Sequence, residues 1–279
     1  MNSACAPAPA TATRWRALLE LDYAAGPVRT YLRQWRHQGP LLVQRAFHPE
    51  PGGVCHSYVL HPPSGLVGGD ELALAACLQR NANVLLTTPA ATKFYRSSGA
   101  TARMTQSLRV ADGASCEWLP QENLLFDGAR VRARTRVELD PGARFFGWEI
   151  ACFGRPACDE AYTRGAADLG FELWREGRPL VLERLRTGGV APAAGAGLRG
   201  HAVSGSLLAT GADRGALDCA RAVDAGTLLA GVTLLGDVLV CRALAPQAEP
   251  VRRWFENVWA QLRPRLLGRV AHSPRIWAT

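Results

Sequence analysis

The sequence predicts a mainly β fold of many strands, with antiparallel or coiled sheets and one or two helices near the C-terminus. Apolar side chains alternate with a period of two in several segments. Turn-forming residues separate these segments at intervals of about a dozen residues, which is typical of all-β architectures. A helical pattern of apolar residues occurs only near the end of the chain.

The period-two alternation is found in five segments. They cover residues 15–23, 54–60, 72–78, 131–139 and 169–173. Because successive side chains of a strand point to opposite faces of a sheet, each segment predicts one buried and one exposed face. Turn signals lie between them: Gly-Gly-Asp at 68–70, Asp-Gly at 112–113 and 127–128, Asp-Pro-Gly at 140–142 and Glu-Gly at 176–177.

The strongest helical pattern covers residues 251–267, where apolar residues recur at steps of three and four. The stripe contains Trp254 and Phe255, which we expect to pack against the sheets. Pro264 lies inside the stripe, so we expect the helix to end or kink near Leu262 or Arg263. A weaker helical pattern covers residues 213–224.

The predicted organisation is one domain with a short tail. Residues 1–13 consist mostly of Ala, Pro, Thr and Ser and predict a disordered tail. Residues 14–279 form a single β-rich domain, in which a Gly/Ala/Pro loop near 188–200 divides the larger β body from the remainder. Residues 195–200 match G-x-G-x-x-G, but a strand pattern follows them instead of the helix that a dinucleotide-binding loop requires.

The net charge of +8 favours plain solvation over a nucleic-acid partner. A nucleic-acid binder stays a rival interpretation that would need a continuous arginine stripe interleaved with exposed aromatic residues. Of 32 basic residues, Lys93 is the only lysine, and the arginines are spread along the chain. The densest run, at 130–136, places arginines at alternate positions, which is typical of one solvated strand face.

The eight cysteines form no C-x-x-C pair, and residues 1–13 lack the features of a secretory signal. The longest apolar run, at 227–240, is too short to span a bilayer. We therefore expect a cytoplasmic protein, without a membrane partner, whose reduced thiols pack as small apolar groups.

The densest cluster of possible metal ligands consists of His48, Glu50, Cys55, His56 and His61. If residues 54–60 form a strand, Cys55 and His61 share a face but lie roughly 20 Å apart, at about 3.3 Å per residue. His56 points to the other face. This geometry favours ordinary sheet histidines over one shared metal site.

Glu117, Glu122, Asp127 and Glu149 are candidates for acid–base chemistry. Paired carboxylates of this kind would suit a β-helical carbohydrate-active enzyme. Loop anchoring is the favoured interpretation of these carboxylates, but the sequence gives no distance between them, so the enzyme stays an alternative.

Several blocks resemble the UreD (UreH) family of urease accessory proteins. Cys55 and His56 are followed by LHPPSGLVGGD at 60–70 and TTPAATKFYRS at 87–97. EWLPQE at 117–122 precedes LFDGA at 125–129, then GWE at 147–149 and PRIW at 274–277. These blocks occur in the family's order and extend from about residue 40 to the C-terminus.

The resemblance implies a non-catalytic scaffold that binds apo-urease and the accessory protein UreF, and through UreF the GTPase UreG, which carries nickel. It implies a right-handed, β-helix-like winding of strands with two helices near the C-terminus. No tightly bound cofactor is expected, because nickel is handled only transiently.

The resemblance also implies an internal passage for nickel. By matching blocks, its candidate lining or interface residues are Asp70, Thr87, Thr88, Glu117, Gln121, Glu122, Asp127 and Glu149. The same side chains could instead satisfy buried backbone groups. The sequence departs from the family pattern at Pro89, where Gln is expected, and at Ser64, where Gly is expected. Ser64 therefore raises the question of whether this position needs a positive φ.

Overall fold

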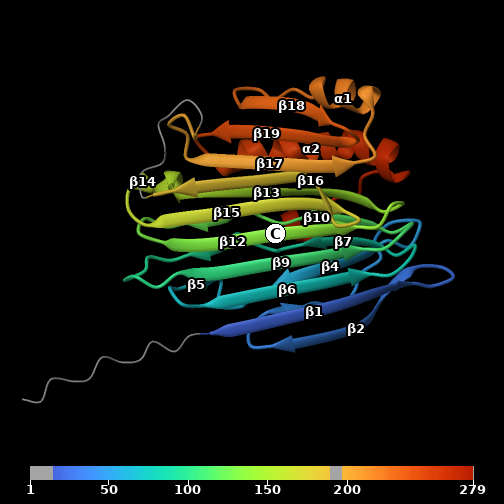
Figure 1. Ribbon diagram of the computed structural model, residues 1–279, viewed down its shortest axis with the longest axis horizontal. Helices are drawn as coiled ribbons and strands as arrows, with labels where there is room; N and C mark the ends of the chain where they lie inside the picture. The colour runs from blue at the N-terminus through green and yellow to red at the C-terminus, as the bar shows by residue number, and fades with distance from the viewer. Residues whose placement is uncertain (1–14, 189–196, 279) are drawn as a thin grey trace, which may run out of the picture.

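The computed structural model describes residues 15–188 and 197–278. Within them the chain is mainly β, wound into a solenoid-like stack of about four turns. Figure 1 shows the strands lying across the molecule in two facing sheets. One sheet has the strand order β16-β15-β12-β9-β6-β1-β2, and the other runs β18-β19-β17-β13-β10-β7-β4-β3.

Each turn of the stack contributes one strand to each sheet. The first turn consists of β4 (Cys55–Leu60), β5 (Gly65–Leu66) and β6 (Glu71–Leu78), and the second of β7 (Asn83–Thr87), β8 (Thr92–Phe94) and β9 (Ala102–Val110). The third turn consists of β10 (Ser115–Leu119), β11 (Asn123–Leu125) and β12 (Arg130–Leu139). The fourth consists of β13 (Arg144–Arg155), β14 (Glu160–Ala161) and β15 (Ala166–Arg175). Equivalent strands of successive turns pair in parallel, as in β6–β9–β12–β15. This arrangement confirms the predicted coiled β body.

Antiparallel strands extend the stack at both ends. At the N-terminal end, β1 (Arg16–Ala25) pairs in parallel with β6 and antiparallel with β2 (Thr30–Gln38), while β3 (Leu42–Val43) pairs with β4. At the other end β16 (Arg178–Thr187) forms a hairpin with β15. The second sheet continues from β13 through β17 (Val203–Thr210) and β19 (Val238–Ala245) to β18 (Leu229–Leu235).

The main core lies between the two sheets and follows the predicted alternation. In β1, for example, Leu19, Leu21 and Tyr23 are buried, while the residues between them are partly exposed. All five predicted strand segments are strands in the structure: β1, β4, β6, β12 and β15. The expected exposed face is wrong for β4, which is buried on both faces.

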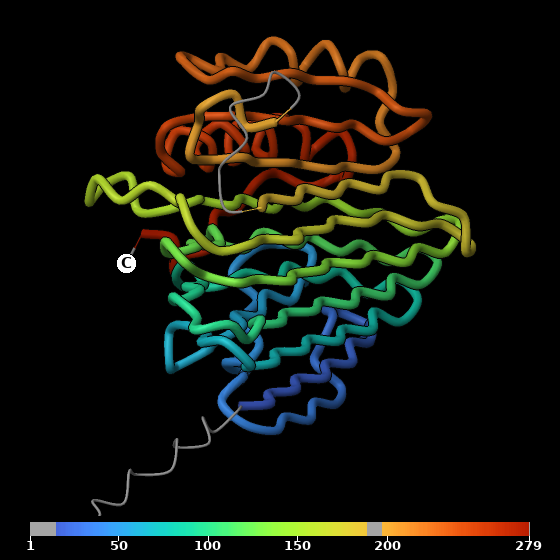
Figure 2. The backbone as a smooth tube through the Cα atoms, turned by 60° about the vertical axis from the view of Figure 1, so that its left-hand side comes forward, coloured from blue at the N-terminus to red at the C-terminus, as the bar shows by residue number. Residues whose placement is uncertain are grey.

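A second core lies on the outer face of the second sheet, where α2 (Ala248–Leu267) packs against β13, β17 and β19 (Figure 2). Trp254 and Phe255 are both buried in it, as predicted. Gly205 of β17 allows this close approach, since a Cβ there would lie 2.6 Å from Val251 and 2.8 Å from Phe255. The weaker predicted helix is α1 (Arg214–Arg221), capped by Asp213, whose carboxylate accepts the Ala216 N–H at 2.8 Å.

Of the two outcomes expected at Leu262 or Arg263, an end or a kink, the structure excludes the end. The helix continues through Pro264 to Leu267, and Gly268, with φ 70°, ends it. Pro264 lacks the N–H that would bond to the Ala260 carbonyl, and Ala260 is exposed. Water can satisfy that carbonyl, so the lost hydrogen bond costs less here than in a buried helix.

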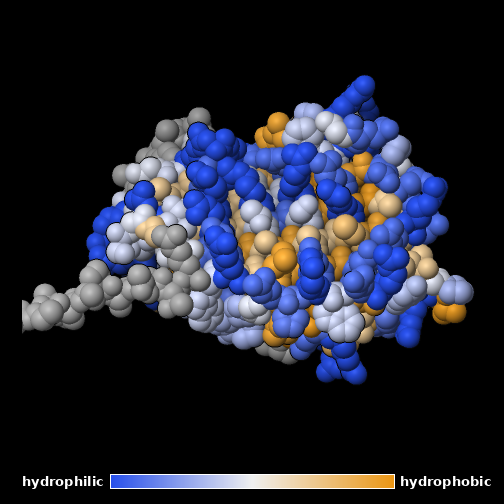
Figure 3. Space-filling view, turned by 60° about the horizontal axis from the view of Figure 1, so that its bottom comes forward, coloured by the Kyte–Doolittle hydropathy of each residue, from blue (hydrophilic) through white to orange (hydrophobic). Residues whose placement is uncertain are grey.

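The arginines of β12 form ion pairs with carboxylates on the outer face of the first sheet. Arg134 pairs with Asp168 at 2.8 Å, and Arg136 pairs with Glu138 and Glu172. From the β1–β2 end, Figure 3 shows hydrophilic side chains over much of this surface, with hydrophobic ones between them. These contacts agree with the predicted solvated face.

The cysteines only partly follow the expectation of packed thiols. Cys55, Cys116, Cys152 and Cys241 are buried, but Cys158 is exposed, because the 3-10 turn at Pro156–Cys158 lies outside both cores. The seven cysteines that the structure describes are free thiols.

The predicted tail at 1–13, and residues 189–196 of the predicted loop, lie outside the described residues. The described chain enters that loop from β16 and leaves it into β17, so the loop connects the two sheets. β17 also confirms that a strand follows the G-x-G-x-x-G match. Of the two described α-helices, neither is long and apolar enough to cross a membrane.

Candidate functional site

Two cavities share the lining residues Asn123 and Glu149. The larger has a volume of about 630 Å³ and is a cleft between the β15–β16 hairpin and the β17–β19–β18 extension. The smaller has a volume of about 300 Å³ and lies between the first three turns of the stack. Because Asn123 and Glu149 line both cavities, we consider this pair of cavities the candidate site.

Glu149 lies on β13, with its carboxylate turned toward the space between the sheets. Its Oε1 accepts hydrogen bonds from Trp118 Nε1 at 2.8 Å and from the Thr135 hydroxyl at 2.7 Å. Its Oε2 accepts one from Asn123 Nδ2 at 3.2 Å. The carboxylate lies deep within the protein yet keeps partial exposure, because it borders both cavities.

Burial raises the pKa of Glu149, and the three hydrogen bonds oppose this rise. Across the described residues, no arginine, lysine or histidine forms an ion pair with this carboxylate. A deeply buried carboxylate without a cationic partner is unusual, and a cation entering either cavity would supply the missing charge.

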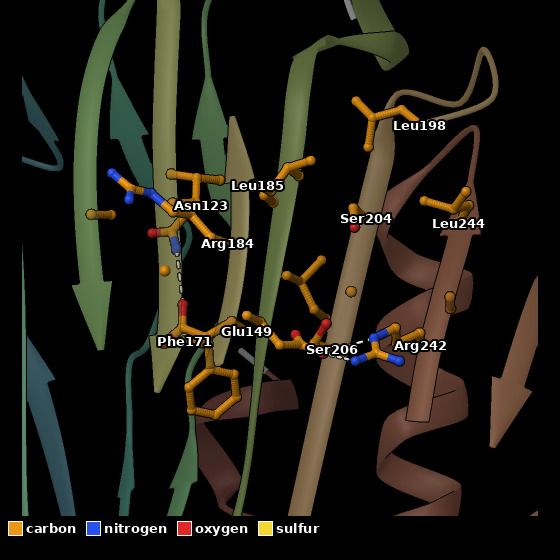
Figure 4. Close-up of a pocket in the computed structure, with 18 of the residues that line it drawn as sticks. Asn123, Glu149, Phe171, Arg184, Leu185, Leu198, Ser204, Ser206, Arg242 and Leu244 are labelled. Atoms are coloured by element: carbon orange, nitrogen blue, oxygen red, sulfur yellow. Dashed lines mark hydrogen bonds and ion pairs between the residues drawn. The ribbon is translucent and has the colours of Figure 1, made fainter. Parts of the chain in front are cut away.

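The larger cavity opens between strands that leave the regular stack (Figure 4). Register places Glu149 beside Ser206 of β17, and Ser206 beside Arg242 of β19. Arg242 spans the gap to the facing hairpin, where its Nε donates to Glu183 at 2.7 Å. Leu244 and Leu185 add apolar surface. The cleft is therefore polar along Glu149, Ser206 and Arg242, and apolar beside them at Leu185 and Leu244.

The smaller cavity brings together three of the predicted passage residues: Thr88, Gln121 and Glu149. The Thr88 hydroxyl accepts the Gln121 N–H at 2.9 Å, which fixes the two segments that follow β7 and β10. Pro89, where the family pattern has Gln, also lines this cavity, so this chain presents an apolar ring there.

Two other predicted residues, Asp70 and Thr87, bind backbone groups. Asp70 is buried and accepts the N–H groups of Val67 and Trp15 at 2.8 and 3.1 Å. Thr87 donates to the Leu119 carbonyl at 2.5 Å and accepts Trp277 Nε1 at 2.9 Å. These bonds hold adjacent turns of the stack and the C-terminal segment in place.

Asp127 and Glu122 also lie away from the cavities. Asp127 accepts the N–H groups of Thr163 and Arg164, each at 2.8 Å, and pairs with the Arg164 guanidinium. Although burial opposes the change, these bonds hold the pKa of Asp127 well below its usual range. Glu122 lies near Cys152, whose pKa is raised to about 12 by burial and by this charge.

Glu117 belongs to a separate buried ion cluster on the outer face of the second sheet. Arg263 of α2 donates to Glu117 through Nε at 2.8 Å and Nη2 at 2.9 Å, and to Glu50 through Nη1 at 2.6 Å and Nη2 at 2.7 Å. Trp259 Nε1 donates to Glu117 at 2.7 Å, and His56 Nε2 lies 2.7 Å from Glu50. Arg263, Glu117 and His56 are fully buried.

This cluster joins β10, β4, the loop containing Glu50, and α2. Burial alone would raise the pKa of Glu50, but hydrogen bonds from His56 and Arg263 lower it to about 2. The Arg263 pKa is raised by its two carboxylate partners despite the opposing effect of burial. Both carboxylates of the cluster are paired with the same guanidinium, so we assign the cluster a structural role.

The structure brings together only part of the predicted histidine–cysteine cluster. Glu50 and His56 touch, but His48 contacts the Thr30 carbonyl instead, at 2.6 Å. Cys55 lies on the inner face of β4, opposite His56, and His61 follows the end of β4 and lines the smaller cavity. The residues described here contain no group of three or more His, Cys, Asp or Glu side chains that could hold a metal ion.

The predicted carboxylates are likewise separated. Glu117 faces α2, whereas Glu149 faces the cavities on the other side of the same sheet. They do not form the converging pair that a carbohydrate-active enzyme would require. Sequence reasoning missed Arg263 and Asn123; an arginine within the apolar stripe of α2, one turn after Trp259, was the available signal for Arg263.

Comparison with known proteins connects this architecture with one family. A family model described as UreD urease accessory protein matches residues 16–278. This range includes both cavities, the ion cluster and α2.

Several curated relatives named urease accessory protein UreD are similar over nearly their whole length. The protein from Azoarcus sp. (strain BH72) is 45% identical over 269 residues, covering 95% of this chain and 94% of the relative. The one from Dechloromonas aromatica (strain RCB) is 42% identical over 279 residues, covering 97% of each chain. The one from Pseudomonas putida (strain ATCC 700007 / DSM 6899 / JCM 31910 / BCRC 17059 / LMG 24140 / F1) is 43% identical, covering 95% and 94%.

Proposed function

Because the chain belongs to the UreD family of urease accessory proteins, we propose that it is a non-catalytic scaffold for urease maturation. In this role it binds apo-urease and UreF, and through UreF it gathers UreG for nickel insertion in the cytoplasm. The observation that carries the proposal is the family match over residues 16–278, together with identities of 42–45% over nearly full length.

We further propose that nickel passes between the two cavities beside Glu149. The supporting observation is that this buried carboxylate borders both cavities and has no cationic partner in the described chain. Oxygen groups that bind a hydrated divalent ion weakly let it move onward, whereas several thiolates would retain it. Thr88, Gln121 and Asn123 supply further oxygens along the smaller cavity.

Asp70, Thr87, Glu117, Glu122 and Asp127 lie outside this route. We assign Asp70, Thr87 and Asp127 to loop and strand anchoring, since each binds backbone N–H or carbonyl groups. Glu117 secures α2 through Arg263. No tightly bound cofactor enters the proposal, because nickel is the cargo.

The proposal is tested by co-purification. The tagged chain should retain UreF and apo-urease from a mixture of the purified proteins, and UreG should join only when UreF is present. Binding of UreG without UreF would contradict the proposed order of assembly. Failure to retain either UreF or apo-urease would refute the scaffold role.

A further inference from the structure

Four arginines surround one carboxylate on the outer face of the first sheet. Asp168 of β15 lies within ion-pair distance of all four, which come from the neighbouring strands β12 and β16 (Figure 1). Arg184 donates to both of its oxygens at 2.9 and 2.8 Å, and Arg134 lies 2.8 Å from Oδ1. Arg186 and Arg132 lie farther away, at 3.4 and 3.9 Å. We call Arg132, Arg134, Arg184 and Arg186 the arginine cluster.

The register of the sheet assembles the arginine cluster. Asp168 is the neighbour of Arg132 on β12 and of Arg186 on β16, so these three side chains form one row across the strands. Arg134 comes from the next row, beside Gly170. A Cβ at Gly170 would lie 2.7 Å from the Arg134 Cδ, so the glycine lets this arginine cross β15 and donate to the Asp168 carbonyl at 2.7 Å. Arg134 is thus part of the fold, whereas the Arg132 and Arg186 side chains are 58% and 62% exposed and accessible to another molecule.

The arginine cluster carries a local excess of positive charge. In the described chain Asp168 is the only carboxylate that pairs with its four arginines, so three positive charges remain. Elsewhere on the same sheet Arg136 pairs with two carboxylates, and Arg33 and Arg36 on β2 pair with one each. Because arginine stays protonated at physiological pH, the excess is permanent. It has to be met from outside the described chain, by solvent ions or by a ligand.

The spacing of the arginine cluster fits carboxylates on an extended chain. Arg132 and Arg134 are two positions apart on one strand, as are Arg184 and Arg186, which corresponds to about 6.6 Å. Acidic residues at alternate positions of an extended segment have the same spacing, and they point to one face. Such a segment can therefore pair with both rows at once.

A nucleic acid fits this face less well, because single strands need exposed aromatic side chains on which their bases stack. The exposed aromatic residues of the described chain are Trp15, Tyr31 and Trp35, which lie on or beside β1 and β2. Trp174 of β15 is partly buried beneath Arg136, whose guanidinium lies 4.1 Å from the ring centre. The arginine cluster therefore offers charge without a stacking surface.

We propose that the arginine cluster is a docking surface for an acidic, extended segment of a partner protein. Carboxylates of that segment neutralise the excess guanidiniums, while Asp168 keeps the cluster oriented. Positive surfaces of this kind accelerate association with an acidic partner and make it dependent on salt. The inference rests on the proposed function and adds the chemistry by which the scaffold recognises one of its protein partners.

The test is fluorescence anisotropy with the full chain and three labelled probes. The probes are a peptide of alternating Glu and Thr, a peptide of the same length with Gln in place of Glu, and an oligouridylate of the same charge as the acidic peptide. The acidic peptide should bind, its affinity should fall as salt is raised, and the neutral peptide should not bind. No binding of the acidic peptide at low salt, or tighter binding of the oligouridylate, would overturn the proposal.

The double variant Arg132→Gln with Arg186→Gln assigns the binding to the arginine cluster. Both side chains are exposed and Asp168 keeps its two closest partners, so Tm should not change. An exposed charge pair contributes up to about fivefold in affinity, so this variant should bind the acidic peptide roughly tenfold more weakly. The matched control, Arg33→Gln with Arg36→Gln, removes the same charge from β2 and should bind it as the wild type does. Equal losses in the two variants would show that only net charge matters, and the inference would be wrong.

Kinetics with purified UreF and apo-urease separate this inference from the scaffold role. The Arg132→Gln, Arg186→Gln variant should associate more slowly with one of the two proteins and dissociate at nearly the wild-type rate, because charges at the rim of an interface act mainly on association. Unchanged association with both would overturn the docking role of the arginine cluster. If the wild-type chain binds neither protein, the scaffold role is refuted, while the peptide titrations still decide whether the cluster binds acidic segments.

Discussion

Replacing Arg263 by methionine should destabilise the protein severely. One guanidinium satisfies two buried carboxylates through four hydrogen bonds of 2.6–2.9 Å, and it also donates to the Val270 carbonyl. Methionine has a similar length but leaves Glu50 and Glu117 buried without their cation. Removing one partner of a buried ion pair costs about 3–5 kcal/mol.

The loss of stability caused by Arg263→Met can be measured by thermal and urea unfolding. For a chain of 279 residues the entropy of unfolding is about 0.6 kcal/mol/K, so the expected loss lowers Tm by about 5–9 °C. Arg265→Met in the same helix is the control. Arg265 pairs with Asp213 at the surface, where both side chains are exposed and water screens the charges, so a much smaller loss is expected.

The destabilisation caused by Arg263→Met should also depend on pH. Hydrogen bonds lower the pKa of Glu50 from 4.5 to about 2 in spite of its burial, a shift that corresponds to about 3 kcal/mol. This stabilisation is fully present above pH 4.5 and is lost as the pH falls toward 2. The difference between wild type and Arg263→Met should therefore shrink across that window. Equal losses for Arg263→Met and Arg265→Met at pH 7 would refute the assignment.

Three further outcomes follow from the structure. Trp254→Ala should lower stability by about 3–5 kcal/mol, because the ring is 3% exposed in the second core; an unchanged Tm with lost UreF binding would assign the ring to an interface instead. Glu149→Gln should fold and bind UreF and urease normally but reduce the nickel content of urease, measured by metal analysis; full nickel content would exclude Glu149 from the route. Ser64→Gly should raise the free energy of unfolding by up to about 1 kcal/mol in urea titrations, since Ser64 has φ 65°; a clear decrease would show that the hydroxyl, and not the backbone, matters.

The fold could be predicted from the sequence to a large extent because burial follows the local pattern. Alternation in β1, β6 and β12 places every second residue in the core, so the buried face of each strand could be predicted from its own segment alone. What alternation does not encode is which strand lies beside which. The parallel stacking of β6, β9 and β12 depends on contacts between residues about 30 positions apart.

The site was less predictable for the same reason. Glu117 and Glu149 look alike in sequence, yet their side chains point to opposite faces of one sheet and have different partners. The opposite faces follow from the register, since Glu117 pairs with Phe146, three positions before Glu149. The partner of Glu117 is Arg263, which lies 146 residues away and reaches it only when α2 packs on the sheet. The Ser64 question, in contrast, is answered by local geometry: this position does have a positive φ.

The central claim is tested most directly by the nickel content of urease matured with and without this chain. The cognate urease should be produced together with UreF and UreG in nickel-supplemented cells, purified, and measured for nickel per active site. With the wild-type chain, urease should carry its full complement of nickel and be active; without the chain it should remain largely nickel-free. Equal nickel content in both preparations would contradict a role in nickel insertion.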